Sequence, residues 1–333
     1  MSPRLVLVTG GAGFIGSNIV AELAANPGLD VAVCDRLRGA ALGKWRNLSK
    51  HPIVDFVAPD DLWDWLRGRG ADVMVIIHMG AVSSTTEADA DKIIDTNFAL
   101  SRDLYDWCAA KDRRLIWASS AATYGDGEGG FDDVQDLGAL AALRPLNAYG
   151  WSKSLFDCYA AREAGRGRAP RQWTGLKFFN VYGPNEAHKG AMRSVASQIW
   201  PDVAAGSPVK LFRSYKPGVA DGGQQRDFIY VRDVAKVVTW LFDRGDVNGV
   251  FNLGSGIARS FEDLATTAFK AAGEVPNIEY VEMPPDLRDR YQYFTQARME
   301  RLRAAGYAAP FTSLEDGVED YVRRFLSQPD PYR

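Results

Sequence analysis

The chain has 333 residues, of which 46% are hydrophobic and 24% charged, and its 39 basic and 42 acidic side chains give a formal net charge of −3. At roughly 100–200 residues per domain, this length suggests about two structural units that bury a sizeable core without disulfides or metals. The near balance of charge argues against nucleic acid or an anionic membrane surface as the main partner. Local basic clusters can still bind a small phosphorylated ligand.

Cysteine and histidine side chains are few and scattered. The cysteines are Cys34, Cys108 and Cys158, and the histidines are His51, His78 and His188. This spacing is typical of reduced thiols and lacks a metal-ligand pattern, so we expect neither disulfides nor a bound metal. The apolar run at 5–8 is too short for a signal peptide, and no run long enough to span a membrane follows. We therefore expect a cytoplasmic protein with no membrane partner.

Strand and helix patterns alternate along the first half of the chain. Short runs rich in Val and Ile, typical of buried strands, alternate with stretches whose apolar residues recur at helical spacing. The predicted strands are 4–9, 31–34, 73–77, 114–118 and 173–179, and the predicted helices are 14–25, 91–110 and 149–163. Apolar strands of this kind indicate a doubly wound parallel sheet covered on both faces, an α/β fold over residues 1–180.

The pattern loosens after Asn180, where prolines and a Gly-rich stretch at 218–223 interrupt it. A smaller α/β substrate-binding domain is predicted over 181–327. Helical patterns at 232–242 and 260–272 flank a short strand at 250–253, so we expect segments within about 228–260 to return to the first domain. The two domains are therefore interleaved, and 328–333 is expected to be a loose tail.

The segment Thr9–Gly16 places Gly10, Gly13 and Gly16 between the first strand and the first helix. One glycine turns tightly, one lets a pyrophosphate approach the backbone, and one lets the helix pack on the strand, while the helix N-terminus faces the phosphates. Asp35 ends the next strand, 19 residues after Gly16, where a carboxylate can bond an adenosine ribose. The motif predicts a Rossmann-type dinucleotide-binding domain.

Basic residues after Asp35 bear on which dinucleotide binds. Arg36 and Arg38 follow directly, and Lys44 is close in sequence. Such side chains suit a ribose 2′-phosphate, which favours NADP. NAD stays open as the alternative, because Asp35 alone favours a free 2′-hydroxyl and the basic residues can be solvated loop charges.

Tyr149 and Lys153 are four residues apart and therefore share one face of the predicted helix. A cation beside a phenol lowers the phenol's pKa, so we expect Tyr149 to act as a general base near neutrality and Lys153 to hold the nicotinamide ribose. Ser120, at the end of an apolar strand, is expected to donate a hydrogen bond to the substrate oxygen. A Tyr–Lys pair alone is common on surface helices, but its combination with the glycine loop and the serine favours a catalytic role.

These three motifs, in this order, resemble the extended short-chain dehydrogenase/reductase family, which includes nucleotide-sugar epimerases and dehydratases. The resemblance covers most of the chain and implies a catalytic set of Ser120, Tyr149 and Lys153. It implies cofactor contacts from Gly10, Gly13, Phe14, Ile15, Gly16, Asp35, Arg36, Arg38, Lys44, Met79, Gly80, Ala81, Val82, Ser83, Thr96, Tyr149, Lys153 and Asn180.

Further stretches resemble the ADP-glyceromanno-heptose 6-epimerase branch of that family. They are 81–87, 178–184, 188–192, 290–296 and the ending 302–311. This resemblance implies inversion of C6 of ADP-D-glycero-D-manno-heptose with bound NADP, which supplies a heptose precursor of the lipopolysaccharide core. Inverting an unactivated carbinol requires hydride removal, turning of the carbonyl and hydride return to its other face, so each orientation needs its own acid/base. The resemblance assigns one role to Tyr149 and the other to a desolvated Lys189, which is otherwise a surface charge or a phosphate ligand.

Substrate contacts are implied by the same resemblance. They come from Ser120, Asn180, His188, Lys189, Gln198, Phe212, Arg213, Tyr215, Arg226 and Tyr291. Arg226 is the best diphosphate ligand on physical grounds, because a guanidinium matches phosphate oxygens bidentately. The alternative for Arg226 is an ion pair with Asp227 or Asp233, and Tyr291 can equally be a core aromatic.

The chain departs from the heptose epimerase pattern at three places. Met79 replaces a Glu found in many members, Ala191 replaces a Ser, and 212–215 replaces Phe-Glu-Gly-Ser before a longer loop. A UDP-sugar 4-epimerase or a nucleotide-sugar dehydratase is therefore an alternative, although Ser120 lacks the acidic pair of a dehydratase. A catalytically silent NADP-binding sensor is the alternative from another class. The family usually self-associates, so we expect a homo-oligomer.

Overall fold

The computed structural model of the chain describes residues 4–37, 43–288 and 291–333. Its centre is a seven-stranded parallel sheet with the strand order β10-β6-β5-β4-β1-β2-β3. The strands are β1 (Arg4–Thr9), β2 (Leu29–Cys34), β3 (Asp55–Val57), β4 (Val73–His78), β5 (Arg114–Ser120), β6 (Gln172–Phe178) and β10 (Gly249–Leu253). The predicted α/β fold class is confirmed.

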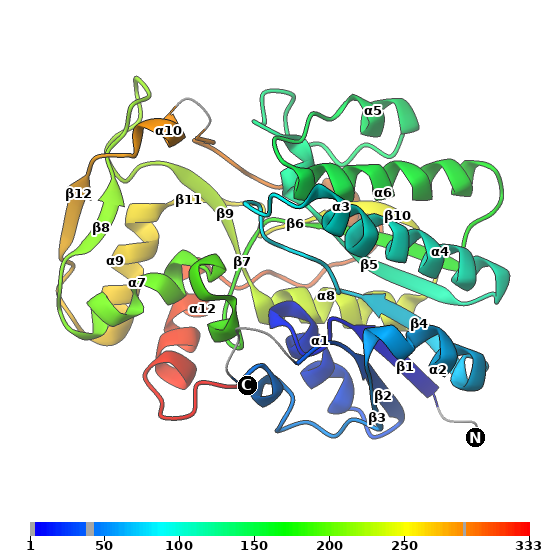
Figure 1. The fold of residues 1–333 in the computed structure, drawn as a ribbon. Helices are drawn as coiled ribbons and strands as arrows, with labels where there is room; N and C mark the ends of the chain where they lie inside the picture. Colours follow the sequence, from blue (N-terminus) through cyan, green and yellow to red (C-terminus); the bar gives the residue numbers. More distant parts are fainter. Residues whose placement is uncertain (1–3, 38–42, 289–290) are drawn as a thin grey trace.

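Alternate side chains of each strand enter different cores. In β1, Leu5 and Leu7 pack with α2 (Leu62–Arg69), α4 (Leu100–Ala110) and α6 (Ala148–Gly165), whereas Val6 and Val8 pack with α1 (Phe14–Ala24) and α8 (Val231–Arg244). Figure 1 shows α1 and α8 on one side of the sheet and α4 and α6 on the other. Because both faces are covered, the strands are apolar at nearly every position, which is the pattern that the sequence displays.

The strand order reverses between β1 and β4, and the loops that follow these two strands lie against each other. The Met79 amide donates to the Thr9 carbonyl at 3.0 Å, and a side chain at Gly10 would come within 2.5 Å of the Gly80 nitrogen. In doubly wound sheets, such a reversal opens a crevice at the carboxyl ends of the strands, which is where ligands bind.

The predicted helix at 91–110 forms as three joined pieces. They are α3 (Ala90–Ile93), a π-helical turn (Ile94–Ala99) and α4. Within the π-helical turn the buried Asn97 accepts from the Val82 amide at 2.8 Å and donates to the Val82 carbonyl at 3.0 Å. Single π-helical turns often occur at functional sites, and this one fixes the loop that follows β4.

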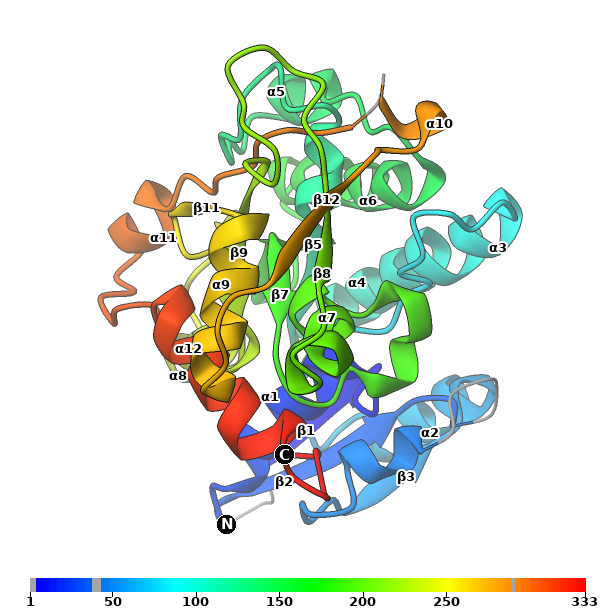
Figure 2. The ribbon, with the colours of Figure 1, turned by 90° about the vertical axis from the view of Figure 1, so that its left-hand side faces the viewer.

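The later part of the chain builds a second core around two small sheets. One sheet contains β7 (Asn180–Tyr182), β9 (Gln225–Tyr230) and β11 (Ala258–Ser260), and the other contains β8 (Val209–Phe212) and β12 (Ile278–Val281). The helices here are α7 (Val195–Ala204), α9 (Phe261–Ala272) and α12 (Leu314–Tyr321). Figure 2 shows β8 and β12 running together, with α9 and α12 beside them. Residues 231–253 leave this unit, since α8 contacts α1 and β10 pairs with β6.

Short helices connect these elements. They are α5 (Leu137–Ala142), α10 (Pro285–Arg288), α11 (Glu300–Ala304), the 3₁₀ turns at Lys44–Asn47, Pro59–Asp61, Ala121–Tyr124 and Ala187–Met192, and a second π-helical turn at Val322–Leu326. Among the described helices, none has the length and apolar character needed to cross a bilayer.

The segment 328–333 is bound to the first domain, so the prediction of a loose tail was wrong. The Arg333 amide donates to Asn185 Oδ1 at 2.9 Å, and its guanidinium donates to the Asn18 carbonyl at 3.3 Å and pairs with Glu22. These partners lie far away in sequence, so local composition held no sign of them.

Candidate active site

A cavity in the crevice beyond β1 and β4 gathers most of the predicted cofactor and catalytic residues. Its lining residues are Gly10, Gly13, Phe14, Ile15, Gly16, Asp35, Lys44, Met79, Gly80, Ala81, Ser83, Ala118, Tyr149, Lys153, Phe178, His188 and Lys189. The predicted residues that do not line it are Arg36, Val82, Thr96, Ser120 and Asn180, and Arg38 lies outside the described residues. Three separate stretches of sequence, each singled out for its chemistry, thus meet in one place.

The glycine loop forms an open cradle at the start of α1. Gly10 has a φ of 66°, a backbone conformation that favours glycine. A Cβ at Gly16 would lie 2.2 Å from the Gly10 carbonyl oxygen, so only glycine allows the helix to begin this close to β1. Gly13 caps α1 without a side-chain hydrogen bond, so the first amides of the helix are available to an anion such as a pyrophosphate.

The Asp35 carboxylate is already engaged by the protein. It accepts from the Ala12 amide at 2.9 Å, the Arg36 amide at 2.6 Å and Lys44 Nζ at 2.6 Å. The Arg36 guanidinium instead pairs with Asp60 at 2.6 Å, outside the cavity lining. Of the two predicted basic residues that the structure describes, Arg36 and Lys44, Lys44 therefore lies at the cavity.

Helix α6 presents Tyr149 and Lys153 to the cavity from one face, and the end of β5 brings Ser120 beside them. The α6 N-cap is Asn147, whose side chain accepts from the Gly150 amide at 2.8 Å, and the Ser120 side chain is hydrogen-bonded to the Tyr149 phenol. Burial lowers the pKa of Lys153 to about 8, because a charged ammonium is poorly solvated there.

The prediction that Tyr149 has a lowered pKa was wrong for the protein without ligand. Burial raises the pKa of the Tyr149 phenol above its ordinary value, and the hydrogen bond from Ser120 only partly offsets this. Sequence spacing places the phenol and the ammonium on one helix face, but it does not report how far each is removed from water, and desolvation is the largest cause of the shift in each pKa.

A buried ion pair behind the catalytic face was missed in the sequence. Lys177 Nζ lies 2.8 Å from Asp157 Oδ2, and the two side chains are 0% and 1% exposed. Asp157 also accepts from Ser119 Oγ at 2.6 Å and from Trp117 Nε1 at 3.2 Å. The sequence signal that could have revealed this pair was Lys177 within the apolar strand β6, because a buried charge requires a partner of opposite charge.

The 3₁₀ turn at Ala187–Met192 brings Lys189 and His188 to the lining of the same cavity. Lys189 Nζ lies 5.3 Å from the centre of the Phe14 ring, and burial lowers its pKa. Burial and the charge of Lys44 lower the pKa of His188 to about 4, so this imidazole is neutral at pH 7. Its Nδ1 accepts from Asn47 at 3.2 Å, while the same amide donates to the Ala12 carbonyl of the glycine loop at 2.9 Å. Asn47 was also missed, since nothing in its local sequence links it to residue 188.

Predicted substrate residues meet at a second cavity in the smaller unit. Its lining residues are Val195, Gln198, Ile199, Lys210, Leu211, Phe212, Gln224, Phe261 and Tyr291. The Arg226 guanidinium lies 5.4 Å from the centre of the Tyr291 ring and 5.5 Å from that of Phe261. The alternative partner Asp227 instead accepts from Ser255, Gly256 and Ala297.

Three predicted substrate residues lie apart from both cavities. Arg213 pairs with Asp221 at 3.2 Å, Tyr215 is hydrogen-bonded to Glu282, and Asn180 is exposed on β7. Arg213 and Tyr215 lie in the segment that departs from the heptose epimerase pattern. Asn180 lies at the end of a strand, where sequence spacing does not fix the direction of a side chain.

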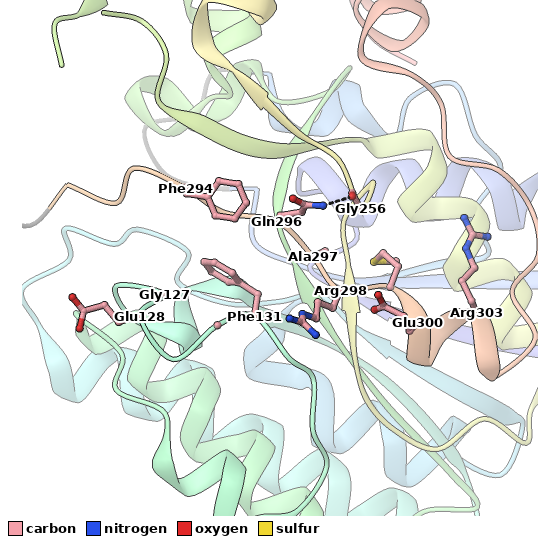
Figure 3. Close-up of a pocket in the computed structure, with 12 residues that line it drawn as sticks. Gly127, Glu128, Phe131, Gly256, Phe294, Gln296, Ala297, Arg298, Glu300 and Arg303 are labelled. Carbon is pink, nitrogen blue, oxygen red and sulfur yellow. Dashed lines mark hydrogen bonds between the residues drawn. The ribbon is translucent and has the colours of Figure 1, made fainter. Parts of the chain in front are cut away.

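A wider hollow of about 870 Å³ lies between the loop at 127–131 and the segment at 294–303 (Figure 3). It holds none of the predicted site residues, and three of its polar side chains bond within the protein. Gln296 donates to the Gly256 carbonyl at 2.7 Å, Arg298 pairs with Asp132 at 3.0 Å, and Arg303 donates to the Tyr307 carbonyl at 2.9 Å. Over the described residues, no group of three or more His, Cys, Asp or Glu side chains is arranged to hold a metal ion.

Known proteins resemble the chain over nearly its whole length. Residues 6–254 match the family model described as the NAD dependent epimerase/dehydratase family. A Nitratidesulfovibrio vulgaris protein named ADP-L-glycero-D-manno-heptose-6-epimerase is 48% identical over 330 residues, which cover 98% of this chain and 100% of that protein. A Fusobacterium nucleatum protein of the same name is 43% identical over 336 residues, with the same coverage.

Solved structures agree with these matches. The Helicobacter pylori ADP-L-glycero-D-manno-heptose-6-epimerase superposes with a TM-score of 0.80 at 28% identity and covers 97% of this chain and 96% of that one. The Thermus thermophilus UDP-glucose 4-epimerase in complex with NAD has a TM-score of 0.72 at 29% identity, with coverage of 95% and 97%.

Proposed function

The chain belongs to the NAD dependent epimerase/dehydratase family, and on this premise we propose that it inverts C6 of ADP-D-glycero-D-manno-heptose to give the L-glycero epimer. One observation carries the proposal: Tyr149 of α6 and Lys189 of the 187–192 turn line the same cavity as the glycine loop. A one-way dehydrogenase needs one proton-transferring group, whereas an enzyme that returns the hydride to the opposite face has a use for two. The names of the relatives at 43% and 48% identity support the same substrate.

The residues around the glycine loop fit a nicotinamide dinucleotide. The open N-terminus of α1 suits the pyrophosphate, and Lys153 lines the same cavity, which supports its proposed role in holding the nicotinamide ribose. When bound, the nicotinamide ring takes up a hydride from the substrate carbon and gives it back. NADP is supported over NAD by Lys44 and by the Asp35 carboxylate, which is occupied by the Ala12 amide and Lys44 rather than open to a 2′-hydroxyl.

Lys44→Met tests the choice of cofactor. A charge-assisted hydrogen bond to a phosphate contributes about 1.5–3 kcal/mol, so the substitution is expected to weaken NADP binding about 10–100-fold while affecting NAD little. Lys50→Met is the control, because Lys50 pairs with Asp330 at the surface. A Lys44→Met protein that keeps the wild-type ratio of NADP to NAD dissociation constants contradicts the assignment.

The two acid/base groups serve the C6 oxygen in its two orientations. Lys189, whose pKa is lowered by burial, takes the proton of the C6 hydroxyl through its neutral amine as the hydride leaves. C6 is bonded to carbon on both sides, so the product is a ketone, and it turns about the C5–C6 bond. Tyr149, whose phenol stays protonated because burial raises its pKa, then gives a proton to the ketone oxygen as the hydride returns to the other face.

The second cavity supports binding of the nucleotide end of the substrate. Phe212 and Tyr291 provide flat apolar surfaces for a base, and Gln198 adds a polar edge. The Arg226 guanidinium lies near both the Tyr291 and the Phe261 rings, and its fork of donors suits a diphosphate.

A panel of ADP-, UDP- and GDP-linked sugars tests the substrate assignment. The purified chain is incubated with each, and NMR reports the configuration of the product. Conversion of the ADP-heptose at C6 is the expected result. Conversion of UDP-sugars alone contradicts the substrate and favours a 4-epimerase, and binding of NADP without turnover of any sugar favours a sensor.

A further inference from the structure

A buried carboxylate anchors the turn that carries Lys189. Glu186 is 1% exposed and directly precedes the 187–192 turn. Its carboxylate accepts from Ser194 Oγ at 2.6 Å, from Tyr321 Oη at 3.1 Å and from the Gly183 amide at 3.4 Å, and it also accepts from the Ser194 amide. These donors include both flanks of the turn and helix α12.

The position of Lys189 depends on this anchor. The Lys189 amide donates to the Glu186 carbonyl at 2.9 Å, so the lysine begins one turn beyond the anchored residue. Gly190 follows with a φ of 56°, and no helix continues through the segment to hold it by backbone hydrogen bonds. The hydrogen bonds of the Glu186 side chain therefore hold this part of the turn, where a continuous helix would otherwise do so.

The charge of Glu186 also acts on Lys189. Burial raises the pKa of Glu186 and lowers that of Lys189, and each group opposes the shift of the other. The other titratable and charged groups that face the cavity are His188 of the same turn, Asp35 and Lys44 near the end of β2, and Tyr149 and Lys153 of α6. The charge that raises the pKa of Lys189 comes from Glu186 and not from any of these cavity groups.

We propose that Glu186 is a positioning residue for Lys189, whose carboxylate holds the turn so that the ammonium stays in the cofactor cavity. This rests on the proposed function of Lys189 as the second acid/base. Because Glu186 accepts from Tyr321 of α12 and Lys189 lines the cavity, the anchor joins the smaller unit to the cavity.

Two variants separate the hydrogen bonds of Glu186 from its charge. Glu186→Ala removes every tie. Glu186→Gln can still accept from the Ser194 amide and donate to the Ser194 and Tyr321 hydroxyls, which can turn to accept. Glu163→Gln is the control, because Glu163 is a carboxylate that also accepts two side-chain bonds, from Arg166 and Arg168, but at the far end of α6.

Steady-state epimerisation is the first readout. Glu186→Ala is expected to lower kcat about 100-fold or more with little change in KM, as when a proton-transferring group is displaced. Glu186→Gln is expected to recover activity to within about tenfold of the wild type, and Glu163→Gln to match it. Wild-type kcat in Glu186→Ala overturns the proposal, as does an equal loss in a folded Glu186→Gln.

Labelling of Lys189 with acetic anhydride, read by mass spectrometry against pH, is the second readout and needs no substrate. Loss of the Glu186 charge is expected to lower the pKa of Lys189, so that near pH 8 its amine reacts several-fold faster in Glu186→Gln and faster still in Glu186→Ala. If Glu186→Ala fails to fold, Glu186→Gln decides through its activity, and a loss of kcat of about 100-fold or more in the folded Gln variant overturns the proposal. If the wild type epimerises no ADP-heptose, the proposed function fails while the labelling still tests the anchor.

Discussion

Breaking the Asp157–Lys177 pair is expected to destabilise the chain strongly. Lys177 Nζ lies 2.8 Å from the Asp157 carboxylate, and both side chains are essentially inaccessible to water. Lys177 also donates to Thr123 Oγ1 at 2.7 Å. Because its ammonium is not in contact with water, these protein groups alone stabilise its charge. Lys177→Met leaves the carboxylate charged and buried, which costs about 3–5 kcal/mol. For a chain of this size that corresponds to a fall in Tm of roughly 6–10 °C.

A double-mutant cycle measures this coupling by thermal unfolding, followed by circular dichroism. The variants are Lys177→Met, Asp157→Asn and the double variant, which removes both charges and keeps an acceptor for Ser119. The double variant is expected to be more stable than either single variant, because no unpaired charge remains. Arg323→Met is the control, since its pair with Glu319 is exposed and contributes at most about 1 kcal/mol. Single variants that melt within about 2 °C of the wild type refute the reasoning.

Three further predictions concern the catalytic face. Tyr149→Phe and Lys189→Ala should each lower kcat by about 10²–10⁴, measured by NMR of the product, and normal turnover in either variant removes its assigned role. The pKa of Lys153 is lowered to about 8 by burial, so its charge is lost as the pH rises through that value, and kcat/KM should fall above it; a flat profile up to pH 10 contradicts this. Gly16→Ala should abolish cofactor binding, measured by calorimetry, because its Cβ would lie 2.2 Å from a loop carbonyl, whereas Gly68→Ala in open space on α2 should bind normally.

The strands, the glycine loop and the Tyr149–Lys153 pair were predictable because their signals are local. Apolar runs report burial on both faces of a sheet, and a spacing of four places two side chains on one helix face. These rules predicted the crevice beyond β1 and β4 and the residues of α6 that line its cavity. The assignment of Lys189 came from resemblance, because spacing alone does not show what a lysine in a turn contacts.

What the sequence did not reveal depends on contacts between distant segments. Asn47 reaches His188, Glu186 reaches Tyr321, and Arg333 reaches Asn185, and no local pattern records such pairs. The pKa of Tyr149 was predicted in the wrong direction because burial is set by tertiary packing. Arg36 was assigned to the cofactor on proximity in sequence, and its exposed guanidinium pairs with Asp60 in the structure, so its cofactor contact stays a prediction.

The most direct test of the account uses ADP-D-glycero-D-manno-heptose that carries deuterium at C6. The purified chain is incubated with this substrate in ordinary water, and the C6 configuration and deuterium content of the sugar are read by NMR and mass spectrometry. The account predicts a mixture of both C6 epimers that retain the deuterium, because the hydride that leaves C6 is the one that returns. Inversion with loss of deuterium to water would indicate proton abstraction at carbon, and absence of inversion would contradict the proposed reaction altogether.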